Sequence, residues 1–259
     1  MKLLLPPDEV HLWLAFSDED ADARCLSKYR QVLSEGERLQ EKRFRFGRDQ
    51  RRYVVTRAFV RTVFSRYSGR TLGYWEFAGD AYGRPVLMNG EGIARSMSFN
   101  LSHTDGLIIC AVSHTLVVGA DVENFRVRPV ALEIADRYFS SNEAAVLRAL
   151  PTTKQAEVFF HYWTLKEAYI KAKGKGLSIP LNRFSFSFPC ETGRDLSFRS
   201  ELDPSDVAYR FWLLQPSTEH IAAVCVQRQS DDPQRLVIRR ITPLGQEEAF
   251  SCSILLSSR

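Results

Sequence analysis

Two parts of the sequence follow the same plan, and this repetition limits how the chain can fold. In each half, a helical stretch with charged residues ends at a glycine-containing stop and leads into several strand-like segments. The stops are Ser68-Gly69 and Gly174-Lys175-Gly176, and glycine readily adopts the left-handed conformation that ends a helix. Because 259 residues can bury one core or two modest halves, the pattern suggests an internal duplication.

Hydrophobic periodicity predicts the order of the elements. Strands are predicted at 10–16, 75–77, 96–101, 107–112 and 116–122, and again at 184–188, 209–213 and 221–226. The segment 116–122 is mostly apolar and is therefore predicted to be a central strand. Helices are predicted from Ser17-Asp18 towards Leu33, after Ser34, up to Ser68, at 130–139, after Ser140 or Ser141, and around Trp163. From about Asp231 the chain is more polar, which predicts a peripheral strand and tail.

The predicted helix around Trp163 carries an unusual combination of side chains on one face. Trp163, Glu167 and Lys171 follow at four-residue steps, so an aromatic ring, a carboxylate and an ammonium stack along one ridge. Upstream, Asp121 and Glu123 are two residues apart in a predicted strand and point to the same side. Mg²⁺ prefers such oxygen ligands and takes phosphate oxygens in its remaining positions. The combination predicts a site that holds a divalent metal against a phosphate.

A simpler interpretation exists for Asp121 and Glu123 alone. Both acids could mark the end of a strand and pair with nearby arginines. Asp121, however, lies in an otherwise apolar strand, where an unpaired charge costs free energy. Once the helix with Glu167 and Lys171 is added, the metal site is the better interpretation.

The segment Phe99-Asn100-Leu101-Ser102-His103-Thr104 is a second candidate for function. It is predicted to span a strand end and the start of a turn, where N–H and hydroxyl groups are free to hold a phosphate. The His103 ring could donate to a phosphate oxygen or transfer a proton, although a lone histidine in a loop is usually only solvated. A serine hydrolase triad is rejected, because adjacent Ser102 and His103 side chains diverge on a strand and no Gly-x-Ser-x-Gly turn exists.

Overall charge and cysteine content exclude some classes of protein. A net charge of +4 is compatible with an anionic ligand or an acidic partner but does not require nucleic acid. The five cysteines are scattered without a Cys-x-x-Cys pair, so neither structural zinc nor a disulfide framework is expected. The N-terminus is too short for a signal sequence and no long apolar run follows, so we expect a cytoplasmic protein.

In chain order, four segments resemble the motifs of the 4'-phosphopantetheinyl transferases. They are Gly83-Arg84-Pro85, Phe99-Asn100-Leu101-Ser102-His103-Thr104, Val118-Gly119-Ala120-Asp121-Val122-Glu123 and Trp163-Thr164-Leu165-Lys166-Glu167-Ala168-Tyr169-Ile170-Lys171. Each motif alone is weak, but four in order are specific. The resemblance runs from about Arg43 to Leu181.

The length resembles that of the surfactin-synthetase-activating type, a pseudo-dimer in one chain. This implies an α+β fold of two similar α/β halves related by pseudo-two-fold symmetry, each a small sheet packed with a long helix. We expect an N-terminal half at 1–117 with the nucleotide and phosphate contacts. The C-terminal half at 118–259 would carry the metal-binding acids and the catalytic helix. A monomer is expected.

The resemblance implies a transferase. Such an enzyme moves 4'-phosphopantetheine from coenzyme A to a serine of an acyl or peptidyl carrier protein and releases 3',5'-ADP. Mg²⁺ is the implied cofactor and coenzyme A the co-substrate. The carrier proteins of this family are acidic four-helix domains, and neither nucleic acid nor a membrane is an expected partner. The pathway, whether fatty acid, polyketide or nonribosomal peptide synthesis, is left open.

The implied catalytic and metal-binding residues come from the last three motifs. Asp121, Glu123 and Glu167 would hold Mg²⁺, and Glu167 would also accept the proton of the attacking serine. Lys171 would stabilise charge on the pyrophosphate. Ser102 and His103 would contact the phosphates of coenzyme A, and His103 would also take part in catalysis.

The implied nucleotide contacts come from the N-terminal half. Gly83, Arg84 and Pro85 would line the nucleotide, with Arg84 where lysine is frequent. Arg52 would meet the 3'-phosphate. Some relatives carry lysines for the 3'-phosphate near the positions of Glu37 and Gln40. This chain lacks lysines there, so Lys42, Arg43 or Arg48 could also contact the 3'-phosphate.

Two other functions remain as alternatives, and the carrier-docking segment is a further expectation. A metal-dependent nuclease or phosphodiesterase would also use acids, a lysine and a basic surface, but would not explain the Asn100-Ser102-His103 segment. A non-catalytic carrier- or nucleotide-binding module would leave the three acids without a purpose. The loop 124–129 and the predicted helix 130–139 are expected to help dock the carrier.

Overall fold

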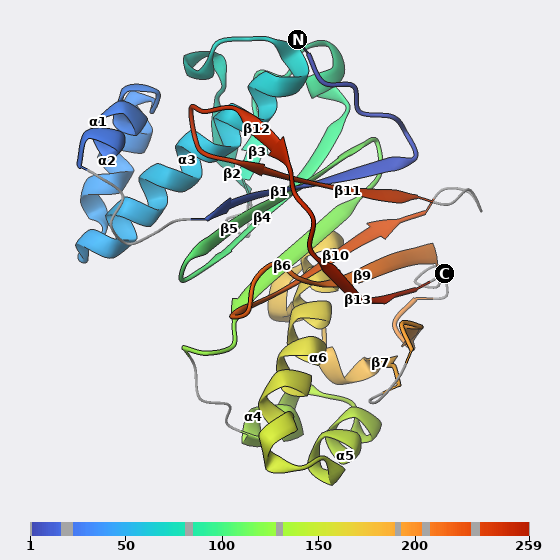
Figure 1. Ribbon diagram of the computed structural model, residues 1–259. Coiled ribbons are helices and arrows are strands. Elements are labelled where there is room, and N and C mark those ends of the chain that lie inside the picture. Colours follow the sequence, from blue (N-terminus) through green and yellow to red (C-terminus); the bar gives the residue numbers. More distant parts are fainter. Residues whose placement is uncertain are drawn as a thin grey trace.

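The computed structural model describes residues 2–16, 23–80, 85–127, 132–189, 193–203, 208–228 and 234–258. Helices and strands are mixed along the chain, and the predicted α+β class is confirmed (Figure 1). The helices are α1 (Ala23–Gln31), α2 (Glu35–Arg43), α3 (Gly47–Ser68), α4 (Leu132–Tyr138), α5 (Ser141–Ala149) and α6 (Thr152–Lys173). Four short 3₁₀ turns are η1 (Leu72–Tyr74), η2 (Gly92–Arg95), η3 (Gly176–Ser178) and η4 (Leu181–Arg183).

Most strands belong to two sheets, and two short hairpins accompany them. The first sheet has the order β12-β11-β1-β5-β4, and the second has the order β13-β9-β10-β6. Their strands are β1 (Glu9–Phe16), β4 (Met97–Thr104), β5 (Leu107–His114), β11 (Arg235–Ile241) and β12 (Glu247–Ala249), then β6 (Val118–Asn124), β9 (Tyr209–Gln215), β10 (His220–Gln227) and β13 (Ser253–Ser257). The hairpins pair β2 (Phe77–Gly79) with β3 (Pro85–Leu87) and β7 (Phe184–Ser187) with β8 (Ser197–Ser200).

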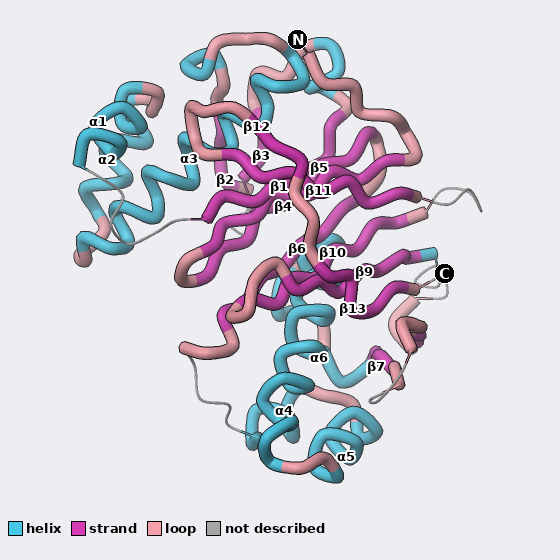
Figure 2. Tube along the Cα trace, in the orientation of Figure 1, coloured by secondary structure: helices cyan, strands magenta, loops and turns pink. Residues whose placement is uncertain are grey.

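The two sheets lie between the two long helices (Figure 2). One face of the first sheet packs on α3 through a core that includes Trp13, Phe59 and Cys110. One face of the second sheet packs on α6 through a core that includes Leu165 and Phe211. The remaining faces of the two sheets meet in a third core, formed mostly by aliphatic side chains together with Trp212. Each sheet is thus buried on both faces, which explains why its strands read as continuous apolar runs.

The two halves repeat one another in detail, as the predicted duplication requires. Helices α2 and α5 each begin with a capping box, formed by Ser34 with Glu37 and by Ser140 with Glu143. The long helices α3 and α6 each have 22 residues, and each is followed by a glycine in the left-handed conformation, Gly69 or Gly174. The same kind of sheet packs on each helix, so the expected pair of similar halves is confirmed.

A buried ion pair also occurs at the matching place in each half. The capping-box glutamate of α2, Glu37, accepts a 2.6 Å contact from Arg61 of α3. The capping-box glutamate of α5, Glu143, lies 2.8 Å from Nζ of Lys166 on α6. The Lys166 ammonium is fully buried and also donates to the carbonyl oxygens of Leu181 and Phe184, at 2.8 and 2.7 Å. Lys166 therefore joins α6 to α5 and to the start of β7.

Replacement of Lys166 by methionine is expected to destabilise the protein strongly. The Lys166→Met variant leaves the buried Glu143 carboxylate without its cation, and loss of one partner of a buried pair costs about 3–5 kcal/mol. Urea denaturation should show this loss of unfolding free energy. The double variant Lys166→Met/Glu143→Gln should recover part of it, and equal stabilities for the single variant and the wild type would contradict the role of the pair.

Several predicted boundaries differ from the structure for local reasons. Strand β4 continues to Thr104 because only Asp105-Gly106 form the turn, with Gly106 at φ 85°. Ser102 and His103 therefore lie on the strand rather than in the turn. The strand predicted at 75–77 begins two residues later, after η1.

Strand β6 was predicted to be central and instead lies at the end of its sheet. Its side chains are apolar because α6 covers one face and the first sheet covers the other. The helix start at Ser17-Asp18, the loop residues Gly83 and Arg84, and residues 128–131 of the expected docking segment lie outside the described residues.

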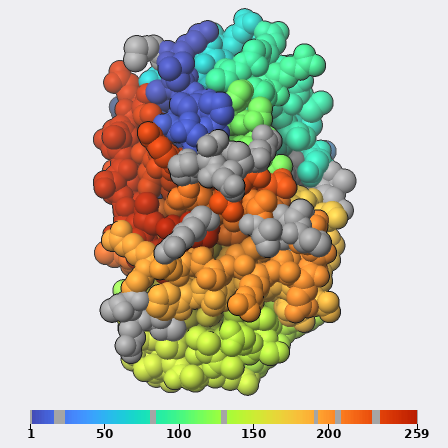
Figure 3. Space-filling view, turned by 90° about the vertical axis from the view of Figure 1, so that its right-hand side faces the viewer, coloured from blue at the N-terminus to red at the C-terminus, as the bar shows by residue number. Residues whose placement is uncertain are grey.

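The C-terminal segment returns to the first half. Strand β11 pairs in parallel with β1, and Figure 3 shows these C-terminal residues in red beside the blue N-terminal ones. Strand β13 then adds to the second sheet by pairing with β9. The division into 1–117 and 118–259 stays a prediction, because strands from the second segment contribute to both sheets. No helix in the described ranges is long and apolar enough to cross a membrane.

Candidate functional site

The candidate site lies where the edge strands of the two sheets meet. Strands β4 and β6 each pair with only one neighbour in their own sheets, and side chains of β4 link them. The Asn100 side-chain oxygen accepts the N–H of Ala120 at 3.1 Å, and the Thr104 hydroxyl accepts the N–H of Asn124 at 3.1 Å. Asn100 and Thr104 of β4 thus accept hydrogen bonds from backbone N–H groups on the edge of β6 that has no paired strand.

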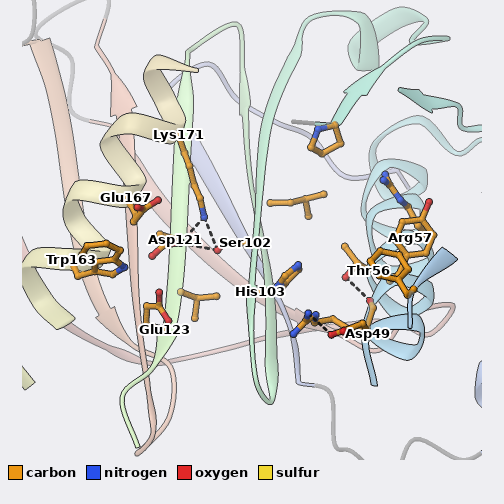
Figure 4. A pocket seen from close by; sticks show the side chains of 16 residues that line it. Asp49, Thr56, Arg57, Ser102, His103, Asp121, Glu123, Trp163, Glu167 and Lys171 are labelled. Carbon is orange, nitrogen blue, oxygen red and sulfur yellow. Dashed lines mark hydrogen bonds and ion pairs between the residues drawn. The ribbon is translucent and has the colours of Figure 1, made fainter. Parts of the chain in front are cut away.

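A pocket of about 500 Å³ opens along this seam, between α3 and α6 (Figure 4). Its lining includes the following predicted residues: Arg52, Pro85, Ser102, His103, Asp121, Glu123, Trp163, Glu167 and Lys171. They come from five different elements in both halves. Among the predicted site residues, only Gly83 and Arg84 are not placed here, since they lie outside the described ranges.

Gly119 sets how closely α6 approaches β6. A Cβ atom at this position would lie 2.0 Å from the carbonyl oxygen of Ala168 and 2.6 Å from the backbone nitrogen of Ala172. Only glycine allows such an approach of a helix backbone to a strand. This contact orients the face of α6 that carries Glu167 and Lys171 towards the pocket.

Lys171, Asp121 and Ser102 form a triangle of short contacts. The Lys171 ammonium lies 2.6 Å from Oδ1 of Asp121 and donates to Oγ of Ser102 at 2.8 Å. The Ser102 hydroxyl donates to the same Asp121 oxygen at 2.8 Å. Asp121 is only 4% exposed, and its other oxygen, Oδ2, is buried with no hydrogen-bond partner among the described residues. A buried carboxylate oxygen without a donor is a position that a cation or ligand would stabilise.

Glu167 lies beside two other acids in this pocket. Burial, the Asp121 carboxylate and the Glu123 carboxylate raise the pKa of Glu167 to about 7, and Lys171 opposes part of this rise. Three acids that repel one another in a half-buried pocket are the kind of donor set that holds a hard divalent cation. Within the described ranges, however, no three His, Cys, Asp or Glu side chains lie close enough together to hold one ion as they stand. In this arrangement, Lys171 supplies the positive charge next to Asp121.

The charge of the pocket lining favours an added cation. The described lining residues include four carboxylates, those of Asp49, Asp121, Glu123 and Glu167, against three permanent cations, those of Arg52, Arg57 and Lys171. A phosphate-bearing ligand would therefore meet a lining with more acids than bases. The residues fit a divalent metal by the chemistry of their oxygen donors and by the unpartnered oxygen of Asp121.

His103 and Arg52 lie on the opposite side of the pocket, towards α3. Desolvation by the pocket wall lowers the pKa of His103, and the positive charges of Arg52 and Lys171 lower it further. The Arg52 guanidinium donates to Asp49 at 2.8 Å. His103 is therefore neutral near pH 7 and can donate one ring N–H.

The sequence interpretation did not include part of the α3 wall. Asp49, Tyr53, Thr56 and Arg57 also line the pocket, one or two turns from Arg52. They share one face of the helix with Arg52 at three- to four-residue steps. That spacing was present in the sequence and could have identified them.

The raised pKa of Glu167 predicts a pH-dependent stability for the metal-free protein. Its pKa is about 7 in the folded state against an ordinary value of 4.5, so the native state holds the proton more tightly than the unfolded state. The free energy of unfolding should therefore fall as pH rises from about 4.5 to 7, and this contribution should level off above pH 7.

Denaturation of the wild type and of Glu167→Gln at pH 5 to 8, with a chelator present, checks this expectation. For Glu167→Gln, the free energy of unfolding should not show this decrease with rising pH. Added Mg²⁺ should stabilise the wild type more at pH 8 than at pH 5, because the ionised carboxylates bind it. Parallel stability curves for the two proteins would assign the pH dependence to other groups.

Comparison with known proteins identifies related sequences. A model described as the 4'-phosphopantetheinyl transferase superfamily matches residues 117–225, and one described as 4'-phosphopantetheinyl transferase, N-terminal, matches residues 21–115. The chain is 37% identical over 177 residues to the 4'-phosphopantetheinyl transferase HetI of Nostoc sp., covering 68% of this chain and 73% of that protein. It is 34% identical over 158 residues to the 4'-phosphopantetheinyl transferase Sfp of Bacillus subtilis, covering 61% and 67%.

Solved structures with partial similarity include two smaller relatives. A holo-[acyl-carrier-protein] synthase of Thermotoga maritima aligns with a TM-score of 0.37 and 22% identity, over 44% of this chain and 65% of that chain. A holo-(acyl-carrier-protein) synthase of Bacillus anthracis, in complex with CoA (3',5'-ADP), aligns with a TM-score of 0.36 and 20% identity, over 44% and 98%. TM-scores this low carry no conclusion about the site.

Proposed function

Because the chain belongs to the 4'-phosphopantetheinyl transferase superfamily, we propose that it transfers 4'-phosphopantetheine from coenzyme A to a carrier-protein serine. The product is a holo carrier protein, and 3',5'-ADP is released. One observation supports this assignment most directly: residues of the family-like motifs at positions 85, 102–103, 121–123 and 163–171 line one pocket. We further propose that the protein acts as a cytoplasmic monomer on acidic carriers.

Glu167 is the proposed general base for the serine hydroxyl. Its position supports this role, because Glu167 lines the same pocket as Ser102, His103 and Lys171. Its pKa of about 7 applies to the metal-free pocket, and a bound Mg²⁺ would lower it and keep the carboxylate ionised as a proton acceptor. Glu167 lies on a helix fixed by the contact at Gly119 and by the buried Lys166, which holds the carboxylate in a defined direction. The proton of the attacking serine would move to this carboxylate.

Lys171, Ser102 and His103 are the proposed contacts to the pyrophosphate of coenzyme A. Transfer of a phosphoryl-type group needs positioned positive charge more than covalent help. Lys171 supplies a permanent charge, and Ser102 and His103 supply uncharged donors on the facing strand. Arg52 is the proposed contact to the 3'-phosphate, with Gly83, Arg84 and Pro85 at the nucleotide.

We propose Mg²⁺ as the metal, held by Asp121, Glu123 and Glu167. When bound, it would neutralise charge on the pyrophosphate oxygens. The closeness of the three acids and the buried, unpartnered Oδ2 of Asp121 support this, because both would be stabilised by a bound cation. Nothing supports the alternative of a nuclease.

One assay tests the proposed function. The protein is incubated with coenzyme A, Mg²⁺ and an apo carrier protein, and the carrier is weighed by mass spectrometry. A gain of one phosphopantetheine mass is expected, and it should disappear when a chelator is added. Absence of transfer to every one of several acyl and peptidyl carriers would overturn the proposal.

A further inference from the structure

Helix α2 buries two acids and exposes Leu39, its one apolar side chain apart from glycine. Two of its three acids point inwards, since Glu37 and Glu41 are each 7% exposed and pair with Arg61 and Arg30 at 2.6 and 2.8 Å. Its apolar residue Leu39 points outwards and is 55% exposed. A surface helix normally buries its apolar side chains and leaves its charges in water. The outward face of α2 is therefore not explained by packing within this chain.

The loop after α2 continues this exposed face. Phe46 is 59% exposed, and the Arg45 guanidinium lies 5.6 Å from the centre of its ring. Lys42, Arg43 and Arg48 are also exposed. We name the six residues Leu39, Lys42, Arg43, Arg45, Phe46 and Arg48 the α2–α3 corner. In the described part of the chain, none of the four cations of the corner forms an ion pair. An exposed aromatic ring surrounded by arginines is typical of a protein-binding surface.

The α2–α3 corner borders the mouth of the pocket. Phe44 and Asp49, which lie within the same stretch of chain, are part of the pocket lining. On the α6 side, Trp163 of the pocket lining contacts Tyr138 of α4, a helix in which Glu133 and Asp136 accompany Arg137. The pocket itself has more carboxylates than permanent cations. Among the described residues, the lining therefore offers no excess of positive charge to an acidic protein, whereas the corner does.

We propose that the α2–α3 corner is a docking surface for the acidic carrier protein, an inference that rests on the proposed function. The four cations would face acidic side chains of one carrier helix, and Leu39 and Phe46 would take its apolar side chains. A carrier held there would have its serine next to the pocket mouth. The expected docking segment around α4 would then contact the carrier from the opposite side.

The test uses residues of the corner that have no proposed contact to coenzyme A. Arg45→Glu reverses one charge, and Leu39→Ser/Phe46→Ser removes the apolar pair. Matched controls make the same kinds of change at exposed positions outside the corner and outside the pocket lining: Arg199→Glu on β8, which pairs with β7, and Leu177→Ser in η3. The probe is an apo acyl carrier protein whose acceptor serine is replaced by alanine, so that binding is measured without transfer.

Each corner variant should bind this carrier about tenfold or more weakly than the wild type, while the controls should not differ from it. Arg45→Glu should also flatten the dependence of binding on salt concentration, because one screened attraction becomes a repulsion. The dissociation constant for coenzyme A and kcat at saturating unmodified carrier should stay unchanged.

Two results would overturn the inference without touching the proposed function. The first is carrier binding by both corner variants that equals the wild type, in a protein that still transfers phosphopantetheine. The second is unchanged carrier binding together with weaker binding of anionic vesicles or nucleic acid, which would give the corner a different partner. If the wild type transfers nothing to any carrier, the proposed function itself fails, and that outcome is read from a separate assay.

Discussion

Glu167→Gln is expected to lower kcat/KM for phosphopantetheine transfer by about 10³-fold or more. The change removes the proton acceptor, whose contribution alone is typically 10²–10⁴-fold, and it also removes one proposed oxygen ligand of the metal. Transfer is measured by mass spectrometry of the carrier with coenzyme A and Mg²⁺ at saturation.

The fold of Glu167→Gln should stay intact. In the metal-free protein at pH 8, the variant should be at least as stable as the wild type, because the mutual repulsion with Asp121 and Glu123 is relieved. Glu157→Gln is the matched control, since Glu157 lies on the same helix but outside the pocket lining, is partly exposed and pairs with Lys154. A Glu167→Gln variant that retains a tenth of the wild-type rate would remove Glu167 from the mechanism.

Gly119→Ala should damage both stability and activity. The new Cβ would meet the backbone oxygen of Ala168 at 2.0 Å, and no side-chain rotation can relieve a contact with the helix backbone. Helix α6 must move away from β6, at a cost of about 1–3 kcal/mol of stability for overpacking. Because α6 carries Glu167 and Lys171, a shift of about 1 Å could lower the rate by about 10²-fold.

The control for this substitution is Gly36→Ala. Gly36 lies in α2, and a Cβ there would meet nothing within 4 Å. Alanine should even stabilise this helix by about 0.5–1 kcal/mol. Urea denaturation and steady-state kinetics on both variants check the pair. If Gly119→Ala behaved like Gly36→Ala, the close approach of α6 would not be needed for the site.

Much of the site was predictable because helix and strand periodicity is local. The four-residue steps from Trp163 to Lys171 place their side chains on one face wherever the helix packs, and the two-residue step from Asp121 to Glu123 does the same on a strand. The capping boxes at Ser34 and Ser140 and the glycine stops likewise depend only on nearby residues. The similarity of the four motifs to one family then connected segments that local patterns could not connect.

Other features could not be predicted because they depend on contacts between distant segments. The apolar run of β6 indicated a buried strand, but it could not tell a central strand from an end strand covered on both faces. The α3 residues beside Arg52 belong to the site only because β4 and β6 meet edge to edge.

The sequence by itself determined which side chains share a face, where the helices start and stop, and which family the motifs resemble. Only the tertiary structure decided which charges lie together: Lys171 with Asp121 and Ser102, two acids beside a Glu167 whose pKa is about 7, and two acids turned inwards on α2. The reason is physical. Direction along a helix or strand is fixed by backbone geometry, but distances between elements depend on packing, and here the missing side chain at Gly119 sets how closely α6 approaches β6.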